Sequence, residues 1–222
     1  MMKNIVRILD IQQVTHNVKC FKLEKPAGYH FLPGQATDVS INIPGMEEEV
    51  RPFTFTALVS EPYLEFTIKG YYDHEGVTNK LHQLKVGDEL ILADAWGAIG
   101  YKGAGYFIAG GAGITPFMAI LRELHKENKL SGNQLFFSNK TAADIIYEQE
   151  LKSMLGDQVV FILSGENKEG YLNGHIDEAF IKENMTVLDK EFYVCGPDQM
   201  VADVNAHLEK LGVKADSLAF EK

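Results

Sequence analysis

The spacing of apolar residues changes near residue 100, and this change constrains the fold more than any other feature. Up to that point, short segments alternate apolar with polar residues between turn signals, which is typical of an antiparallel β-barrel or sandwich. The expected strands are 18–23, 36–43, 51–58, 64–70 and 89–94, with a short helix at 78–83. Beyond that point, strand-like and helix-like segments alternate, which predicts a parallel sheet covered by helices.

The second half also suggests where one domain ends and the next begins. Its expected strands are 106–109, 134–138, 159–164 and 192–195, and its expected helices are 116–126, 145–155, 176–182 and 198–211. Three glycines between Gly100 and Gly105 interrupt both patterns. We therefore predict a two-domain β + α/β protein, with an antiparallel β-barrel at 1–100 and a doubly wound parallel sheet at 101–222. A length of 222 residues suits two such compact domains.

Charge and cysteine content argue against several functions. A formal net charge of -10 disfavours a broad surface for nucleic acid or anionic membranes. The N-terminus lacks the apolar core of a signal peptide and no run of about 18 apolar residues occurs, so we expect a cytoplasmic protein without membrane insertion. Cys20 and Cys195 are too few for a four-thiolate iron–sulfur or zinc site, and the seven histidines lack metal-ligand spacing. We expect no metal, and a monomer.

A glycine-rich turn joins an apolar strand to an amphipathic helix in the second half. It comprises Gly110, Gly111, Ala112, Gly113, Ile114, Thr115 and Pro116. Glycines let a ligand approach the backbone closely, and N–H groups at a helix start favour an anion such as pyrophosphate. Because the motif is not the spaced G-x-G-x-x-G fingerprint, a nucleotide site and a tight turn without a ligand are about equally supported locally. Its position in the first βα turn of a doubly wound sheet favours the nucleotide.

A second turn, Cys195-Gly196-Pro197, follows a later strand and faces the same edge of the predicted sheet. Taken alone, this cysteine is equally compatible with a small buried apolar side chain. Two glycine turns at the carboxyl ends of separate strands of one sheet favour a ligand cleft.

The barrel half contains two weaker signals. Arg51, Phe53 and Thr54 offer a cation, an aromatic face and a hydroxyl, but strand alternation puts Thr54 on the opposite face unless the strand bulges or twists. An ordinary edge strand is the alternative. The segment Gly76–Thr78 offers backbone N–H groups before a short helix, and a simple N-cap by Thr78 is the alternative there.

In their order, the segments RPFT, TIKG, GVTNKL, WG, GGAGITP and CGP resemble the ferredoxin–NADP reductase superfamily over nearly the whole chain. The resemblance implies a flavin-binding barrel followed by a nicotinamide-nucleotide domain. It also implies hydride transfer from NAD(P)H to FAD, with FMN the less favoured flavin. The family pattern Arg-x-Tyr-Ser is changed at two positions, where Phe53 and Thr54 keep an aromatic face and a hydroxyl but lose the phenolic group.

The family's site residues carry over to matching positions. Those implied to hold the flavin are Arg51, Phe53, Thr54, Thr67, Ile68, Lys69, Gly76, Val77 and Thr78. Those implied to hold the nucleotide are Gly110, Gly111, Ala112, Gly113, Thr115, Pro116, Ser138, Lys140, Cys195, Gly196 and Pro197. The implied catalytic positions are Thr54, Cys195 and Glu221, the last in a C-terminal stretch that the family lays near the flavin ring.

The residues leave the nucleotide and the electron acceptor open. Lys140 suits the 2′-phosphate of NADPH, whereas Asn139-Lys140-Thr141 resembles the NADH-using cytochrome b5 reductases. By resemblance the acceptor is a separate flavodoxin or ferredoxin, although a net charge of -10 fits poorly with docking of an acidic carrier. The alternatives are a cytochrome b5 reductase-like enzyme, a free flavin or quinone reductase, an electron-transfer subunit that works only within a complex, and a barrel that binds a partner instead of flavin.

Overall fold

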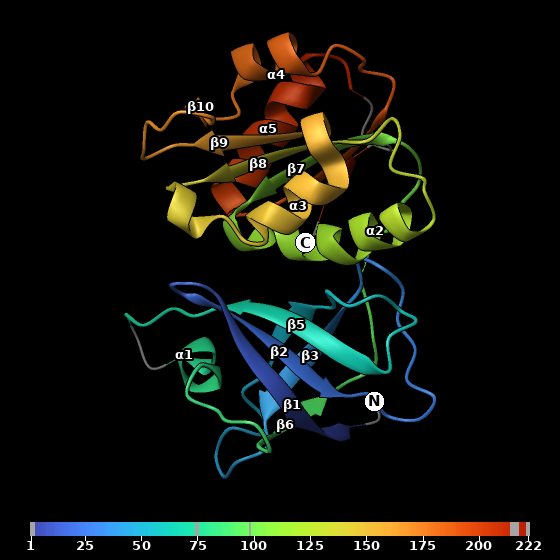
Figure 1. Cartoon of the computed structure of the whole chain (residues 1–222), viewed down its shortest axis with the longest axis vertical. Helices are drawn as coiled ribbons and strands as arrows, with labels where there is room; N and C mark the ends of the chain where they lie inside the picture. The colour runs from blue at the N-terminus through green and yellow to red at the C-terminus, as the bar shows by residue number, and fades with distance from the viewer. Residues whose placement is uncertain (1–2, 74–75, 98, 214–217, 221–222) are drawn as a thin grey trace.

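The computed structural model describes residues 3–73, 76–97 and 99–213, together with the backbone of 218–220. Its two halves are stacked end to end, with the β-barrel below the α/β sheet in Figure 1. Helices α2 (Thr115–Lys126) and α3 (Glu148–Leu155) cover one face of that sheet, and α4 (Glu178–Asn184) and α5 (Asp198–Lys210) cover the other. The predicted fold class, a barrel followed by a doubly wound sheet, is confirmed.

The barrel consists of antiparallel strands in the order β4-β3-β6-β1-β2-β5. These are β1 (Asn4–Thr15), β2 (Val18–Glu24), β3 (Ala36–Ile41), β4 (Arg51–Thr54), β5 (Tyr63–Lys69) and β6 (Glu89–Leu92), with the short helix α1 (Val77–Leu81). The sequence pattern gave no strand at β1. Its pairing with β2 shifts register between Ile8 and Asp10, and such a bulge interrupts the two-residue alternation.

The second sheet is parallel, in the order β10-β9-β8-β7-β11-β12. Its strands are β7 (Gly105–Gly110), β8 (Gln134–Asn139), β9 (Val159–Leu163), β10 (Leu172–Asn173), β11 (Glu191–Cys195) and β12 (Leu218–Phe220). The strands β10 and β12 were not predicted, because two or three residues are too short to show a period. The helix expected at 145–155 begins only at Glu148, since Ile145 is extended and Tyr147 is left-handed, with a φ of 56°.

The two domains share part of one hydrophobic core. The core beneath α2 and α3 contains Phe107, Phe117 and Phe137 of the α/β domain, and it also takes in Val18 and Ile99. Val18 belongs to β2 of the barrel, so the barrel packs directly against the helix face of the sheet. This packing sets the carboxyl edge of the sheet beside the barrel strands.

The connection between the domains is fixed by a buried tyrosine of β11. The Tyr193 hydroxyl accepts hydrogen bonds from the backbone N–H groups of Lys102 (2.9 Å) and Gly103 (3.0 Å) and donates one to the Gly103 carbonyl (2.8 Å). The predicted boundary segment, Gly100–Gly105, is therefore held against the sheet by hydrogen bonds to Tyr193. Among the described residues no helix has both the length and the apolar character to cross a membrane.

Candidate functional site

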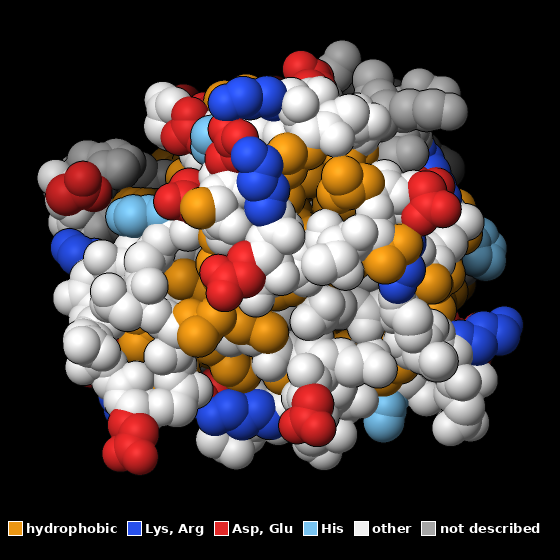
Figure 2. All heavy atoms as spheres, turned by 90° about the horizontal axis from the view of Figure 1, so that it is seen from above, with side chains coloured by type: hydrophobic (Ala, Val, Ile, Leu, Met, Phe, Trp, Pro, Cys, Tyr) orange, Lys and Arg blue, Asp and Glu red, His pale blue; other side chains and the backbone are white. Residues whose placement is uncertain are grey.

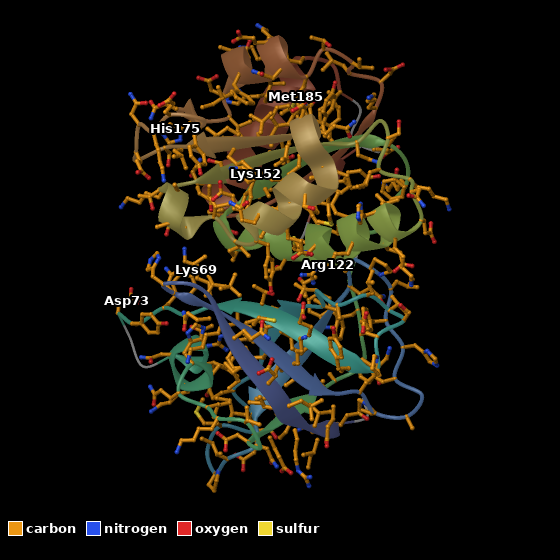
Figure 3. All side chains as sticks on the ribbon, viewed as in Figure 1. Lys69, Asp73, Arg122, Lys152, His175 and Met185 are labelled. Atoms are coloured by element: carbon orange, nitrogen blue, oxygen red, sulfur yellow. The ribbon has the colours of Figure 1, made fainter. Side chains whose placement is uncertain are left out.

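A cavity of about 740 Å³ opens at the carboxyl edge of the parallel sheet and reaches the barrel. The predicted site residues that line it are Lys69, Gly110, Gly111, Ala112, Ser138, Lys140 and Pro197. The order of the strands reverses between β7 and β11, and open α/β sheets bind ligands at such a point. Figure 3 shows Lys69 at the domain junction and His175, which also lines the cavity, above it on the same side. Both domains thus contribute to one cavity.

The turns after β7 and β11 touch through their glycines. A Cβ atom on Gly113 would overlap the carbonyl of Cys195 and lie 2.6 Å from Gly196 Cα. A Cβ on Gly110 would overlap Met200 Sδ and lie 2.9 Å from Pro197 Cδ. No side chain fits at either position. Of the first turn, Gly110, Gly111 and Ala112 line the cavity just before α2, where backbone N–H groups fit the pyrophosphate of a dinucleotide.

Other predicted residues of these turns make contacts within the fold. Thr115 begins α2, and its hydroxyl donates to the Ala112 carbonyl at 3.0 Å. Pro116 follows in the first turn, where a missing N–H is harmless. Cys195 is 5% exposed and packs in the core beneath α2. The roles that the resemblance assigns to Thr115 and Cys195 at the nicotinamide stay predictions.

The edge strands β4 and β5 close the barrel only in part. Two connections join these strands: a β-bridge between Phe55 and Phe66, and a hydrogen bond from the Thr56 N–H to the Glu65 carbonyl (2.9 Å). Among the described residues, no further backbone hydrogen bond links them. Beyond this point, 51–54 and 67–69 each keep one backbone edge without a neighbouring strand. Phe53 lies half-buried beside this opening. Backbone N–H and C=O groups on such free strand edges suit the hydrogen-bonding edge of a planar ring such as isoalloxazine.

Arg51 is the cation at the start of this strand. It is exposed, and its Nη1 donates to the Val50 carbonyl at 2.7 Å. Among the described residues no carboxylate pairs with it, so the guanidinium is available to a phosphate. The pairing of β3 with β4 shows no register shift, so Arg51 and Phe53 share one face and buried Thr54 the other. These three side chains do not converge within the strand.

The three predicted residues of β5 have different surroundings. The Thr67 hydroxyl lies 2.8 Å from the Tyr147 hydroxyl and 3.2 Å from that of Thr56, at the domain junction. Ile68 is buried in the barrel core, and Lys69 lines the cavity. Only Lys69 therefore faces the predicted nucleotide side, and contact of Thr67 and Ile68 with flavin stays a prediction.

The short helix α1 does not begin with the N-cap that the sequence offered as one of two interpretations. Its N-cap is Gly76, and no side chain caps it, so a cap by Thr78 is wrong. The Thr78 hydroxyl instead accepts the Tyr71 N–H at 3.4 Å. A role for Gly76, Val77 and Thr78 at the flavin pyrophosphate stays a prediction. Glu221 lies outside the described residues, and the backbone before it forms β12 beside β11.

A buried histidine at the end of α1 ties this helix to β5. His82 Nε2 donates to the Ile68 carbonyl at 2.9 Å, so Nδ1 carries no proton and accepts from the Tyr72 hydroxyl at 2.8 Å. Burial lowers the pKa of His82 below its usual 6.5, with the Lys19 charge acting in the same direction, while the bond to Ile68 opposes the shift.

We expect His82 to make the protein less stable in mild acid. The unfolded chain takes up the proton near pH 6.5, before the folded chain does, so the free energy of unfolding should fall as the pH drops below that value. Urea unfolding at pH 7.5 and pH 5.5 measures this. The variant His82→Gln keeps a donor for the Ile68 carbonyl. Its free energy of unfolding should differ less between the two pH values than that of the wild type. An unchanged difference would show that other groups cause the loss of stability in acid.

Most of the polar cavity wall was not predicted from the sequence. The unpredicted residues include Asp144, His175, Asp177, Asp203 and His207, whereas Asn139 belongs to the segment that the sequence related to the nucleotide. Asn139 ends β8, is 5% exposed, and neither polar atom of its side chain has a hydrogen-bond partner among the described residues. A buried amide without a partner costs about 1–3 kcal/mol. A polar ligand at this edge would relieve that cost, which fits the ribose side of a dinucleotide.

Comparisons with known proteins agree with this geometry. Residues 6–101 match the family described as oxidoreductase FAD-binding domain, and residues 107–206 match the oxidoreductase NAD-binding domain. The chain is 27% identical to the reductase component of propane 2-monooxygenase from Rhodococcus jostii, over 97% of this chain and 62% of that protein. It therefore spans about three fifths of that relative's length. It is 29% identical to human NADH-cytochrome b5 reductase 1, over 95% of this chain and 82% of that one.

A solved structure shows the same fold. The FAD/NAD-binding domain of nitric oxide dioxygenase from Vibrio cholerae superposes with a TM-score of 0.86 at 24% identity, covering 98% of this chain and 97% of that one. At this identity the likeness concerns the fold alone.

Proposed function

Because the chain belongs to the ferredoxin–NADP reductase superfamily, with an FAD-binding oxidoreductase domain followed by an NAD-binding one, we propose that it passes electrons from a reduced nicotinamide nucleotide through FAD to an acceptor outside these 222 residues. The observation that carries this proposal is the single cavity lined by Lys69 of the barrel and by the glycine turn of the sheet. When bound, the nicotinamide supplies hydride and the flavin accepts it.

The protein's own residues bind and orient. Arg51 would pair with the flavin pyrophosphate, and the opening between β4 and β5 would hold the ring beside Phe53. The turn from Gly110 to Gly113 would hold the nucleotide pyrophosphate against the start of α2. Packing of Val18 in the core beneath α2 and α3 holds the barrel against the α/β domain. Alignment of two bound reactants supplies much of the rate in such reactions.

We propose NADH as the preferred donor. The wall that contains Lys140 also contains Asp144, Asp177 and Asp203, and carboxylates disfavour a 2′-phosphate. We expect kcat/KM for NADH to exceed that for NADPH by about tenfold or more, since about 1.4 kcal/mol of unfavourable contact has this effect. The variant Lys140→Met should lower kcat/KM for NADPH and leave that for NADH within about twofold. Lys168→Met, which removes a lysine outside the cavity, is the matched control; equal use of both nucleotides would contradict the preference.

For the acceptor, a flavodoxin or ferredoxin remains our leading proposal by family resemblance. The names of the relatives point to two more, an oxygenase component and cytochrome b5. A basic docking face would favour an acidic carrier. Figure 2 shows the outer end of the α/β domain, where basic and acidic side chains are interspersed. Oxidation of NADH with ferricyanide, ferredoxin, flavodoxin, cytochrome b5, free FMN and a quinone as acceptors tests the choice. Turnover with ferricyanide alone would favour a subunit that works only within a complex.

A further inference from the structure

A buried network of charges joins the two domains. On α2, the Arg122 guanidinium donates from Nη1 to the Thr56 carbonyl (2.6 Å) and to Glu65 Oε1 (2.8 Å), both in the barrel. It also donates from Nε to Glu150 Oε1 (2.6 Å) and from Nη2 to Glu150 Oε2 (2.9 Å), a bidentate pair with α3. The side chains of Arg122 and Glu65 are only 17% and 8% exposed. Figure 3 shows Arg122 at the junction between barrel and sheet.

Tyr147 completes this network from the loop before α3. Its ring centroid lies 5.0 Å from Arg122 Cζ, and its hydroxyl lies 2.8 Å from that of Thr67 on β5. Its backbone is left-handed, which a residue with a side chain rarely adopts and which persists only where the surroundings enforce it. The backbone thus turns an aromatic ring into the junction, where it covers the guanidinium.

The interface beside the network is not filled with apolar side chains. A second cavity, of about 640 Å³, lies there, and its wall includes Cys20, Lys22, Tyr63, His125 and Met154 together with the network itself. On this side the charged groups therefore make the direct connection between the domains. Buried ion pairs add little net stability, because desolvation offsets much of their attraction, but they demand one particular geometry.

The network connects α2 and β5, the two elements whose relative position matters for the proposed function. Arg122 lies on the helix that begins at the nucleotide-binding turn, and Glu65 lies on the strand that leads to Thr67, Ile68 and Lys69. Resting on that function, we propose that Arg122 is a positioning residue, which holds the nucleotide-binding helix in one alignment with the flavin-side strand. Its loss would leave both binding sites intact and disturb the alignment of their ligands.

The test uses the FAD-loaded chain, mixed anaerobically with increasing NADH in a stopped-flow instrument. In Arg122→Met the limiting rate of flavin bleaching should fall about tenfold to a hundredfold, while the apparent Kd for NADH stays within about threefold. Arg122→Lys keeps the charge but not the planar guanidinium, so its limiting rate should lie between those of the wild type and Arg122→Met. Amide hydrogen exchange should become faster in 64–69 and 115–126 of Arg122→Met, and stay unchanged in β6.

Lys126→Met is the matched control. Lys126 lies on the same helix and also reaches the barrel, but through an exposed hydrogen bond to Ser60 Oγ (2.9 Å), so its rate and exchange should match the wild type. If Arg122→Met does not hold FAD, Glu150→Gln, at the more exposed end of the network, should show the same pattern more weakly. A wild-type limiting rate and wild-type exchange in these variants would overturn the positioning role. If the wild type itself does not bleach, the proposed function fails, and the exchange data still decide whether the network couples the domains.

Discussion

Gly113→Ala should severely weaken binding of NADH while leaving the chain able to bind FAD. The added methyl would overlap the backbone carbonyl of Cys195 and lie 2.6 Å from Gly196 Cα. Because these neighbours are backbone atoms, the two turns must move apart. Overpacking of this kind costs about 1–3 kcal/mol, so NADH affinity should fall by about tenfold to a hundredfold or more. Titration of the FAD-loaded chain with NADH measures it.

Gly100→Ala is the control for this prediction. Gly100 has no atom within 4 Å of its ideal Cβ position and no positive φ, so an added methyl should change neither NADH affinity nor unfolding. Wild-type affinity for NADH in Gly113→Ala would show that the contact between the two turns does not shape the nucleotide site.

Arg51→Ala should weaken binding of FAD by about tenfold to a hundredfold, because a charge-assisted hydrogen bond to phosphate contributes about 1.5–3 kcal/mol. The side chain is exposed, and the bond described for it goes to the Val50 carbonyl beside it. Its removal should therefore leave folding unchanged. Quenching of flavin fluorescence on binding to apoprotein gives the Kd.

Arg7→Ala provides the comparison. Arg7 is another exposed arginine of the barrel, 3.7 Å from Glu89, and its loss should not affect the flavin. Equal affinities for FAD in Arg51→Ala and Arg7→Ala would place the flavin pyrophosphate elsewhere.

The glycine turns were accessible from the sequence because their signal is local. Consecutive residues at the ends of strands show a sharp turn before a helix, and the fold rule for doubly wound sheets brings two such turns to one edge. The alternation of β4 likewise predicted that Arg51 and Phe53 share a face. The strand β1 was missed because a bulge at Ile8–Asp10 breaks its period.

The charged network had no such signal. Glu65, Arg122 and Glu150 come from β5, α2 and α3, and no spacing in the sequence relates them. Asp203 and His207 are four residues apart on α5, but no spacing relates them to Asp144 or to His175 and Asp177, which reach the cavity wall from other segments. The contact between the Thr67 and Tyr147 hydroxyls likewise joins residues of the two domains that no spacing in the sequence relates.

The central claim, that a nicotinamide nucleotide reduces a flavin held by this chain, is tested most directly by anaerobic stopped-flow mixing of the FAD-loaded protein with NADH and NADPH in separate experiments. We expect the flavin absorbance to bleach with a rate that saturates in NADH, and to bleach less efficiently with NADPH. A chain that does not retain FAD, or bound FAD that stays oxidised with both nucleotides, would contradict the account.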